Sequence, residues 1–345
     1  MFKSLSPIEI ALIKKIGGTG GGGGGGGGSS SASPNDVNFY DYDGTIVASY
    51  TLSEAQSLTA LPNAPTHDGL TFQGWNYTLE KVKAFTRPMN VGAMYITDDG
   101  KTRLHIRIAA EGRMNVPLYI SQTVANGVTI DWGDGSATQT LAGTGNVNTT
   151  HTYANIGDYV ITLDPVDGCT LGFGEGSSSY CVMGSTGNNN LVYCNVLQDV
   201  QVGIGVTSIG FCAFAFCYSL ASITIPDGVT SIGIGAFNEC HSLSSITIPD
   251  GVTSIGDATF DSCRSLASIT IPDGVTSIGK FAFNSCYGMA KYHLKPTTPP
   301  TLSNTNAFQS IPSDCIIYVP QGCLETYQNA TNWATYASYM QEEPA

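Results

Sequence analysis

One nine-residue string recurs along this chain at a constant spacing, and this repeat limits the possible folds more than any other feature. Ile-Pro-Asp-Gly-Val-Thr-Ser-Ile-Gly occupies residues 225–233 and returns unchanged at residues 248–256 and 271–279, a period of 23 residues. A shorter version, Val-Thr-Ser-Ile-Gly, precedes them at residues 206–210. Self-similarity at this period is typical of solenoids, in which each coil contacts mainly its two neighbours. We therefore predict a solenoid over residues 201–291, followed by an irregular last coil and a C-terminal cap over residues 292–345.

The repeats align with one another and so predict which side chains stack. Identical side chains one coil apart should form ladders with a spacing of about 4.8 Å. The aligned columns are Phe214, Phe237, Phe260 and Phe283; Cys217, Cys240, Cys263 and Cys286; and Leu220, Leu243, Leu266 and Met289. Cysteine at a core position behaves as a small hydrophobic residue, so we expect free buried thiols, with disulfides between coils as the alternative. Four aromatic residues of the tail are expected to form the core of the cap: Tyr327, Trp333, Tyr336 and Tyr339.

The consensus of the repeat resembles a known family. Ser-Leu-x-Ser-Ile-Thr-Ile-Pro-x-x-Val-x-x-Ile-Gly-x-x-Ala-Phe-x-x-Cys is similar to the BspA-type leucine-rich repeat of bacterial surface proteins and phage-encoded proteins. This chain departs from that pattern only at Thr259, where the family has Ala, and at Met289, where it has Leu. The resemblance implies binding of a protein or a glycan without catalysis.

Positions that vary between nearly identical coils are candidates for ligand contact, because core positions must repeat while surface positions are free to change. One variable column follows the buried cysteine of each coil: Tyr218, His241, Arg264 and Tyr287. A second follows the glycine of each Val-Thr-Ser-Ile-Gly run: Phe211, Ile234, Asp257 and Lys280. Tyr and Arg are enriched at binding hot spots. The alternative is that both columns are ordinary exposed turn residues.

A second module precedes the solenoid. Trp-Gly-Asp-Gly at residues 132–135, His-x-Tyr at 151–153 and Gly-x-Tyr at 157–159, among alternating strands, resemble the PKD domain and imply an Ig-like β-sandwich over residues 103–165. Asp131, Asp134 and Asp158 offer oxygen ligands for calcium, but we favour the interpretation that Asp134 caps amides of its own turn. We therefore predict no cofactor and no metal. His151 is expected to be a packed strand residue, and residues 166–200 a linker and the N-terminal cap of the solenoid.

Residues 36–102 form a further predicted module. The strings Asn-Phe-Tyr-Asp-Tyr-Asp-Gly-Thr at residues 38–45 and Phe-Gln-Gly-Trp at 72–75 resemble the internalin B-repeat, a small β-grasp-like unit with a spacing or adhesive role. Asp41 and Asp43 also fit the opening motif of haloacid-dehalogenase-like phosphatases. That resemblance implies a nucleophile, a general acid and a magnesium ion, on a parallel sheet with alternating helices. The strands here are short and separated by turns, so we favour a hairpin and keep the magnesium-dependent phosphatase as a remote alternative.

The N-terminus is expected to be a tethered segment. Ser-Pro-Ile-Glu at residues 6–9 is a helix start, and an apolar face follows within residues 1–16. Nine consecutive glycines within residues 17–35 then indicate a flexible tether. We interpret residues 1–16 as a helix that docks into a larger assembly or trimerises on it, and a frayed tail is the alternative. The segment lacks the features of a secretory signal.

Charge composition excludes several classes of partner. The chain has 14 Lys and Arg residues against 27 Asp and Glu, a net charge of -13, and no Lys or Arg lies between Arg113 and Arg264. Nucleic acids and acidic membrane surfaces require clustered cations, so neither is an expected partner. No apolar run approaches the roughly 18 residues of a membrane span.

These features together predict a mainly β, non-enzymatic protein that recognises a cell-surface protein or glycan. Motifs of serine hydrolases, zinc proteases and P-loop nucleotidases do not occur in the chain. We expect an extracellular, virion-associated protein of a phage tail or baseplate that attaches to the host. A bacterial cell-surface adhesin is the alternative.

Overall fold

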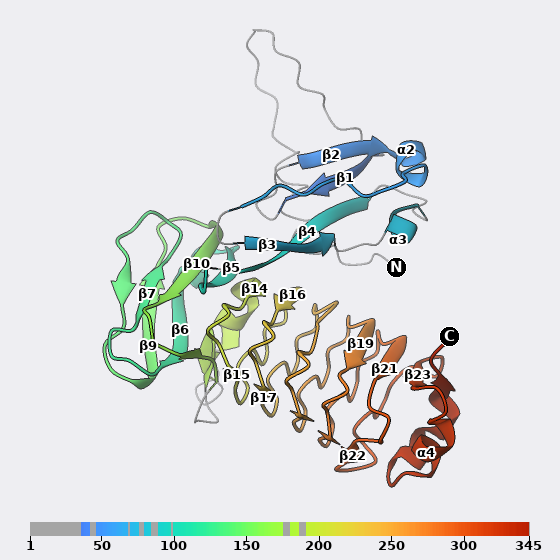
Figure 1. The fold of residues 1–345 in the computed structure, drawn as a ribbon. Helices are drawn as coiled ribbons and strands as arrows, with labels where there is room; N and C mark the ends of the chain where they lie inside the picture. Colours follow the sequence, from blue (N-terminus) through green and yellow to red (C-terminus); the bar gives the residue numbers. More distant parts are fainter. Residues whose placement is uncertain are drawn as a thin grey trace. The chain divides into compact units, whose positions relative to one another are not determined.

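The computed structural model describes residues 36–41, 46–67, 70–75, 79–83, 89–97, 99–174, 180–185 and 191–344. The chain divides into two compact units, Met1–Ile96 and Thr97–Ala345, and each is considered by itself (Figure 1). The docking helix and the glycine tether predicted for residues 1–35 lie outside the described residues. The first unit ends at Ile96, somewhat before the limit of residue 102 that the sequence suggested for this module.

The described residues of the first unit form a four-stranded mixed sheet with two short helices. Its strands are β1 (Asp36–Tyr40), β2 (Ile46–Thr51), β3 (Leu70–Trp75) and β4 (Met89–Thr97), in the order β2-β1-β4-β3. The central strand β1 is antiparallel to β2 and parallel to β4. The helices are α2 (Leu52–Gln56) and α3 (Leu79–Lys83).

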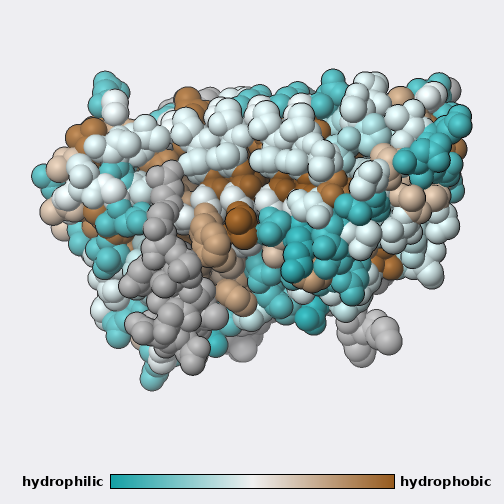
Figure 2. Space-filling model, turned by 90° about the horizontal axis from the view of Figure 1, so that it is seen from below, coloured by the Kyte–Doolittle hydropathy of each residue, from teal (hydrophilic) through white to brown (hydrophobic). Residues whose placement is uncertain are grey.

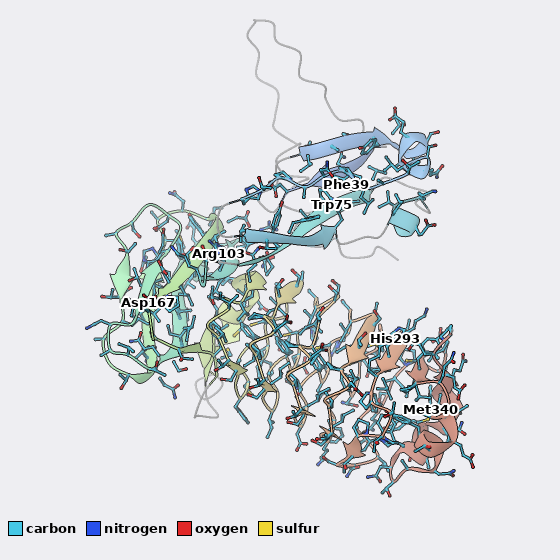
Figure 3. All side chains as sticks on the ribbon, in the orientation of Figure 1. Phe39, Trp75, Arg103, Asp167, His293 and Met340 are labelled. Atoms are coloured by element: carbon cyan, nitrogen blue, oxygen red, sulfur yellow. The ribbon has the colours of Figure 1, made fainter. Side chains whose placement is uncertain are left out.

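Local sequence explains this unit well. Thr51 and Glu54 form a capping box: the Thr51 hydroxyl accepts from the Glu54 amide, and the Glu54 carboxylate accepts from the Thr51 amide. The core contains Phe39 and Trp75, whose rings meet edge to face with centroids 4.9 Å apart (Figure 3). The Trp75 indole donates to the Pro62 carbonyl, which satisfies its buried N–H group.

The second unit begins with two β-sheets that share one core. The first sheet contains β5 (Thr102–Ile108), β7 (Val128–Asp131), β8 (Gln139–Thr140) and β10 (Gly157–Pro165). The second contains β6 (Asn115–Gln122), β9 (Gly145–Thr152) and β11 (Leu171–Gly172), and the 3-10 helix η1 (Glu111–Arg113) lies between β5 and β6. Strict alternation of buried and half-buried residues along β5 follows its apolar-polar sequence pattern. Trp132 is buried and packs in the core that both sheets line.

The first of these sheets continues directly into the solenoid. Strand β14 (Leu197–Gln201) is antiparallel to β5 and parallel to β16 (Ser222–Thr224), the first long strand of the repeats. A hairpin, β12 (Tyr180–Cys181) with β13 (Gly184–Ser185), and the 3-10 helix η2 (Leu191–Val196) lie in the same junction. The N-terminal end of the solenoid is therefore covered by strand β5 as well as by residues 166–200, which the sequence suggested as its cap.

The predicted solenoid is present, and parallel strands join its coils on two sides (Figure 1). One ladder consists of β15 (Ser208–Ile209), β17 (Ser231–Ile232), β18 (Ser254–Ile255), β20 (Ser277–Ile278) and β22 (Thr301–Leu302). On the other side, β16 belongs to the sheet that contains β14 and β5 and forms one isolated parallel bridge, Ser222 to Ser245, with the next coil. A separate parallel sheet then consists of β19 (Ser268–Ile271), β21 (Lys291–Leu294), β23 (Ile316–Val319) and β24 (Met340–Glu342). The prediction of a mainly β fold with a 23-residue solenoid is confirmed.

The aligned phenylalanines form a continuous stack inside the coils. Successive rings of Phe214, Phe237, Phe260 and Phe283 are nearly parallel, with centroids 5.3–5.6 Å apart. The structure extends this stack at both ends, to Phe173 before the repeats and to Phe308 after them. The degenerate sequences around these two residues hid them from alignment.

The cysteine ladder is buried and reduced, as expected. The thiols of Cys240, Cys263 and Cys286 each donate to a phenylalanine carbonyl of the preceding coil at 3.2–3.3 Å. The same carbonyls also accept backbone N–H bonds from Cys217, Cys240 and Cys263 of their own coils, so each thiol adds a second, weak donor that links adjacent coils. Thr259, the one departure from Ala in its column, likewise donates to the carbonyls of Gly233 and Gly256.

The repeated glycine is required by the close approach of adjacent coils. A Cβ atom built on Gly233 would lie 2.7 Å from the Gly210 carbonyl carbon, and one built on Gly279 would lie 2.4 Å from the Asp257 nitrogen. Atoms at such distances overlap, so a larger residue would push the coils apart. The glycine of each Ser-Ile-Gly run is therefore a packing requirement and not a marker of unusual backbone angles.

The tail closes the far end of the solenoid. Helix α4 (Leu324–Asn329) and the 3-10 helix η3 (Trp333–Tyr339) bury Tyr327, Trp333 and Tyr336 against the last coil. Their polar tips are satisfied: the Tyr327 hydroxyl donates to the Pro296 carbonyl and the Trp333 indole to the Pro300 carbonyl. These aromatic residues form the core of the cap, as predicted, with Tyr339 half-buried at its edge. None of the helices in the described part of the chain has the length and apolar character needed to cross a lipid bilayer.

Candidate functional site

The first variable column lies on a corner of the solenoid whose backbone is the same in every coil. The residue two positions earlier has a left-handed conformation each time, with φ between 56° and 62° at Phe216, Glu239, Ser262 and Ser285. A tight backbone bond then closes the turn, as in Tyr218 N–H to the Phe216 carbonyl at 2.8 Å and His241 N–H to the Glu239 carbonyl at 2.9 Å. The fold therefore displays three kinds of side chain, Tyr, His and Arg, from four equivalent positions. We call Tyr218, His241, Arg264 and Tyr287 the corner column.

Exposure within the corner column increases toward the C-terminal coils. Tyr218 and His241 are half-buried, and their rings contact each other with centroids 4.7 Å apart. Arg264 is exposed, and Tyr287 has 58% of its surface accessible. Burial raises the pKa of the Tyr218 hydroxyl, so this side chain is neutral and able to donate a hydrogen bond at physiological pH.

Carboxylates flank the corner column, and sequence reasoning missed them. Glu239 lies 2.6 Å from His241 between Oε2 and Nε2. Asp261 accepts hydrogen bonds from the Asn284 amide at 2.8 Å and the Ser262 hydroxyl at 3.2 Å, and burial raises its pKa. Both acidic residues occupy positions that also vary between coils, so the comparison of repeats contained the signal. The corner therefore combines aromatic faces, one guanidinium and hydrogen-bonding carboxylates.

The second variable column begins where the β15–β22 ladder ends. Phe211 is half-buried and Ile234 is 48% exposed, whereas Asp257 and Lys280 are exposed and charged. The Lys280 amide donates to the Asp257 carboxylate at 2.7 Å, and the Lys280 ammonium lies 4.9 Å from the centroid of the Phe281 ring. Seen from the side of β15, β17 and β22, a line of hydrophobic residues runs between polar rows, with hydrophilic residues gathered to one side (Figure 2). The second column therefore differs from the corner column, because its residues are apolar in the first two coils and charged in the next two.

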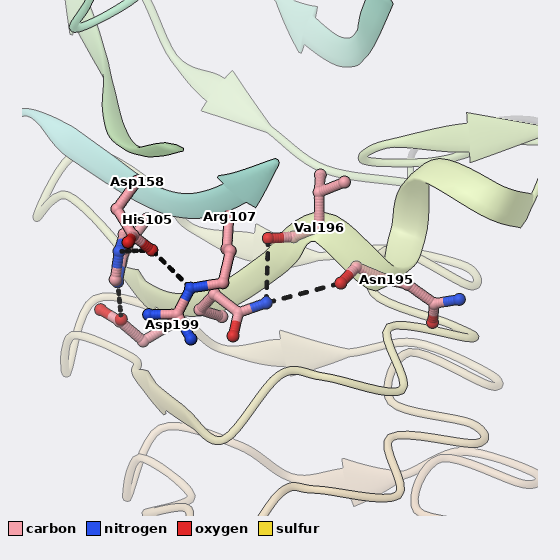
Figure 4. A network of polar contacts seen from close by, with 7 residues as sticks. His105, Arg107, Asp158, Asn195, Val196 and Asp199 are labelled. Atoms are coloured by element: carbon pink, nitrogen blue, oxygen red, sulfur yellow. Dashed lines mark hydrogen bonds and ion pairs between the residues drawn. The ribbon is translucent and has the colours of Figure 1, made fainter. Parts of the chain in front are cut away.

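A half-buried polar network joins the first sheet to the solenoid at the β5–β14 contact (Figure 4). His105 on β5 contacts Asp199 on β14 at 2.7 Å and Asp158 on β10 at 3.5 Å, and Asp158 also accepts from Arg107 at 2.7 Å. Burial disfavours the imidazolium, but hydrogen bonds to the two carboxylates outweigh it and raise the pKa of His105 to about 10. Sequence reasoning missed this network because His105 and Asp199 are 94 positions apart.

This network predicts a pH-dependent stability of the second unit. Because the pKa of His105 rises from about 6.5 in the unfolded chain to about 10 in the fold, its contribution is complete below pH 6.5 and disappears as the pH passes 10. We expect the melting temperature to fall from pH 6.5 to pH 10 more steeply in the native protein than in His105→Gln. Calorimetry across this range measures the difference. Equal slopes in the two proteins would show that the charged network contributes nothing to stability.

The three calcium candidates do not assemble into a metal site. The Asp131 carboxylate accepts from the Gly133 amide at 2.9 Å and Asp134 from the Ser136 amide at 3.0 Å, while Asp158 faces His105 and Arg107. Hydrogen bonds from Ser136 lower the pKa of Asp134 to about 2. Within the described ranges, no group of three or more His, Cys, Asp or Glu side chains could hold a metal ion. The bond from the Ser136 amide to Asp134 is the one that the turn-capping interpretation predicts.

His151 occupies the position expected of a packed strand residue. Its ring stacks on Trp132 with centroids 4.7 Å apart, and its Nε2 lies 2.7 Å from the Asp134 carboxylate. The same carboxylate that caps the turn therefore also fixes this histidine.

Asp41, the proposed phosphatase nucleophile, lies in an unexpected setting. It is buried at the end of β1 and its carboxylate is 2.7 Å from Nε2 of His67. The adjacent strand β2 runs antiparallel to β1, whereas the phosphatase resemblance implies a parallel sheet with alternating helices. Asp43, the second acid of that motif, lies outside the described residues.

The repeated coils and their two parallel ladders define a leucine-rich-repeat solenoid, and the comparisons with known proteins agree. Residues 185–327 match the BspA type leucine rich repeat region, in six copies. This range extends beyond residues 201–291 in both directions, as the phenylalanine stack does. The PKD and internalin resemblances of the preceding modules stay predictions.

Solved structures similar to this chain are also leucine-rich-repeat proteins. The T. pallidum leucine rich repeat protein is 24% identical, with a TM-score of 0.32 over 45% of this chain and 64% of that one. A leucine rich cell surface protein from Faecalibacterium prausnitzii A2-165 is 25% identical, with a TM-score of 0.34 over 50% and 41%. A leucine-rich repeat protein from Bacteroides ovatus ATCC 8483 is 34% identical, with a TM-score of 0.26 over 34% and 36%. This chain covers less than two thirds of each of these proteins, and the search of curated proteins gave no match.

Proposed function

We propose that this protein is a non-enzymatic recognition protein whose solenoid binds a protein or a glycan on a cell surface. One observation carries the proposal: the corner column presents three kinds of side chain, Tyr, His and Arg, from equivalent positions that follow a left-handed residue in each of the four coils. A column with only a structural role would repeat its residue, as the uniform Thr224, Thr247 and Thr270 do. The match to the BspA type repeat over residues 185–327 supports the same class of function.

The chemistry of the corner column suits a ligand with both polar and apolar parts. Exposed tyrosine rings offer flat apolar contact together with a hydroxyl, and Arg264 offers a planar fork of donors. Residues of these types dominate the energetics of protein interfaces. Glu239 and Asp261 at the border of the column add acceptors for hydroxyl or amide groups of the ligand.

Binding by the full-length protein tests this function. Fluorescently labelled protein is added to a panel of bacterial cells and to a glycan array, with the heat-unfolded protein as control. We expect saturable binding to at least one strain or glycan by the folded protein alone. The absence of binding throughout a broad panel, or equal binding by the unfolded chain, would contradict a recognition function.

Magnesium-dependent hydrolysis of p-nitrophenyl phosphate tests the non-enzymatic part of the proposal. We propose that the protein lacks this activity, because Asp41 is engaged by His67 beside an antiparallel strand. Hydrolysis that disappears in Asp41→Asn would establish the phosphatase alternative instead.

We further propose that the protein acts outside the cell, on a phage tail or baseplate that attaches to its host. The sequence feature that favours attachment to a larger assembly is the capping-box segment at residues 1–16, which nine glycines separate from the folded modules. The alternative is a bacterial cell-surface adhesin. The cell-surface description of the Faecalibacterium protein belongs to that protein and suggests this alternative.

Removal of residues 1–16 distinguishes these two placements. We expect the truncated protein to keep the melting temperature of the full chain and to disappear from purified virions, because the segment precedes the glycine tether in the sequence. Immunoblots of gradient-purified particles measure its incorporation. Normal incorporation of the truncated protein would show that the segment is a frayed tail, and detection of the native protein on bacterial envelopes instead of virions would favour the adhesin.

A further inference from the structure

Two of the ten cysteines differ from the ladder in what their sulfur atoms contact. Cys181 ends strand β12 and Cys194 lies in η2, and their Sγ atoms are 2.8 Å apart. Non-bonded heavy atoms prefer a separation of about 3.5–4.0 Å, whereas a disulfide bond brings the sulfurs to about 2.05 Å. Three thiols of the ladder, those of Cys240, Cys263 and Cys286, instead donate to backbone carbonyls, whereas the first, Cys217, has a side-chain hydrogen bond with Cys194. The separation of the Cys181 and Cys194 sulfurs is therefore shorter than a usual non-bonded contact and lies between that distance and the length of a disulfide bond.

The pair occupies the junction between the first sheets and the solenoid. Val182, the neighbour of Cys181, accepts a hydrogen bond from Tyr119 of β6 at 3.0 Å and donates one to Ala213 of the first coil at 2.8 Å. Cys194 lies three residues before β14, the strand that joins β5 to β16. A covalent bond between these two positions would add a link to the backbone hydrogen bonds that already cross the junction.

We propose that Cys181 and Cys194 form a disulfide bond once the protein is in an oxidising environment, and that this bond holds the first coil against the preceding sheets. The oxidant is a small-molecule disulfide such as oxidised glutathione. One cysteine thiolate attacks it, forms a mixed disulfide and releases one glutathione thiol. The second thiolate then attacks the protein sulfur of that mixed disulfide and releases the other glutathione. Two protein thiols lose two protons and two electrons, and the oxidant is reduced to two thiols.

Burial determines when this reaction takes place. Both side chains are almost completely buried, with 1% and 0% of their surface exposed. Hydrogen bonding with Cys194 and burial raise the pKa of the Cys181 thiol, so the reactive thiolate is scarce in the closed fold. Oxidation therefore occurs during folding or when the β12–β13 hairpin opens. Once formed, the bond is protected from reducing agents by the same burial.

Mass spectrometry of the wild-type protein tests the proposal without any variant. The protein is folded in a buffer of oxidised and reduced glutathione, unfolded in the presence of iodoacetamide and weighed intact. We expect eight of the ten cysteines to be alkylated. Trypsin has no cleavage site between Arg113 and Arg264, so chymotrypsin, which cuts after Tyr193, is used to isolate a linked peptide that contains Cys181 and Cys194. Alkylation of all ten cysteines, or linkage of either residue to Cys212 or Cys217, would overturn the proposal.

The melting temperature tests the structural role of the bond. We expect a decrease of roughly 5–10 °C on reduction, from the loop-closure effect of a short disulfide loop. Cys181→Ser and Cys194→Ser should each remove both the linked peptide and the dependence on reductant. Cys263→Ser, a ladder position, is the matched control and should keep both. A melting temperature of the linked wild-type protein that does not change on reduction would show that the bond does not stabilise the junction.

Discussion

Phe237→Ala is expected to lower the free energy of unfolding of the second unit by about 3–5 kcal/mol, the usual cost of truncating a fully buried aromatic residue. Phe237 is 0% exposed, and its ring stacks between those of Phe214 and Phe260 at 5.6 and 5.5 Å. The coils on either side are held apart by their backbone ladders, so they cannot collapse into the space that the missing ring leaves. The cavity is therefore retained, and its cost adds to the loss of apolar burial.

Urea denaturation followed by tryptophan fluorescence and circular dichroism measures this loss. Ile234→Ser, in the same coil but on the exposed second column, is the control and should change stability by no more than about 0.5 kcal/mol. Because coils interact mainly with their neighbours, the two probes are expected to separate in Phe237→Ala as the solenoid unfolds in parts. A loss below about 1 kcal/mol would mean that the phenylalanine stack contributes little to the solenoid.

Replacing all four residues of the corner column by Ser is expected to abolish binding to the target cell or glycan, with a loss of roughly tenfold or more in affinity. The turn that presents them depends on backbone hydrogen bonds and on the residue two positions earlier, so it persists without these side chains. The melting temperature should decrease only slightly. The substitution removes the contacts of His241 with Tyr218 and Glu239, and this loss causes the small decrease.

The matched control for this variant is the uniform column. In this control, all three threonines are changed to Ser: Thr224, Thr247 and Thr270. The number of coils and the net charge stay the same, and we expect binding to persist. Circular dichroism and melting curves establish that both variants are folded. Unimpaired binding by the folded corner-column variant would refute the assignment of this surface, and the second variable column would then be tested in the same way.

Much of the architecture follows from the sequence because its repeats can be aligned with one another. A residue that is buried in one coil must be buried in the next, so Phe214 predicts the environment of Phe283 and the exact repeat predicts the parallel ladders. The capping box at Thr51 and Glu54 and the turn capped by Asp134 were also predictable, since their bonds join residues at most three positions apart. The ends of the solenoid were less predictable, because Phe173 and Phe308 lie in coils whose sequence has diverged.

The contacts that only the tertiary structure decided are those between residues far apart in the sequence. Nothing in the local pattern of β5 indicates that it will pair with β14, or that His105 will lie between Asp158 and Asp199. The same holds for the two sulfurs of Cys181 and Cys194. The sequence by itself determined the repeat, its buried columns and the existence of variable surface positions, because periodic burial is a local constraint. How the solenoid joins the preceding sheets depends on which strand edges meet in space, and only the folded chain brings those edges together.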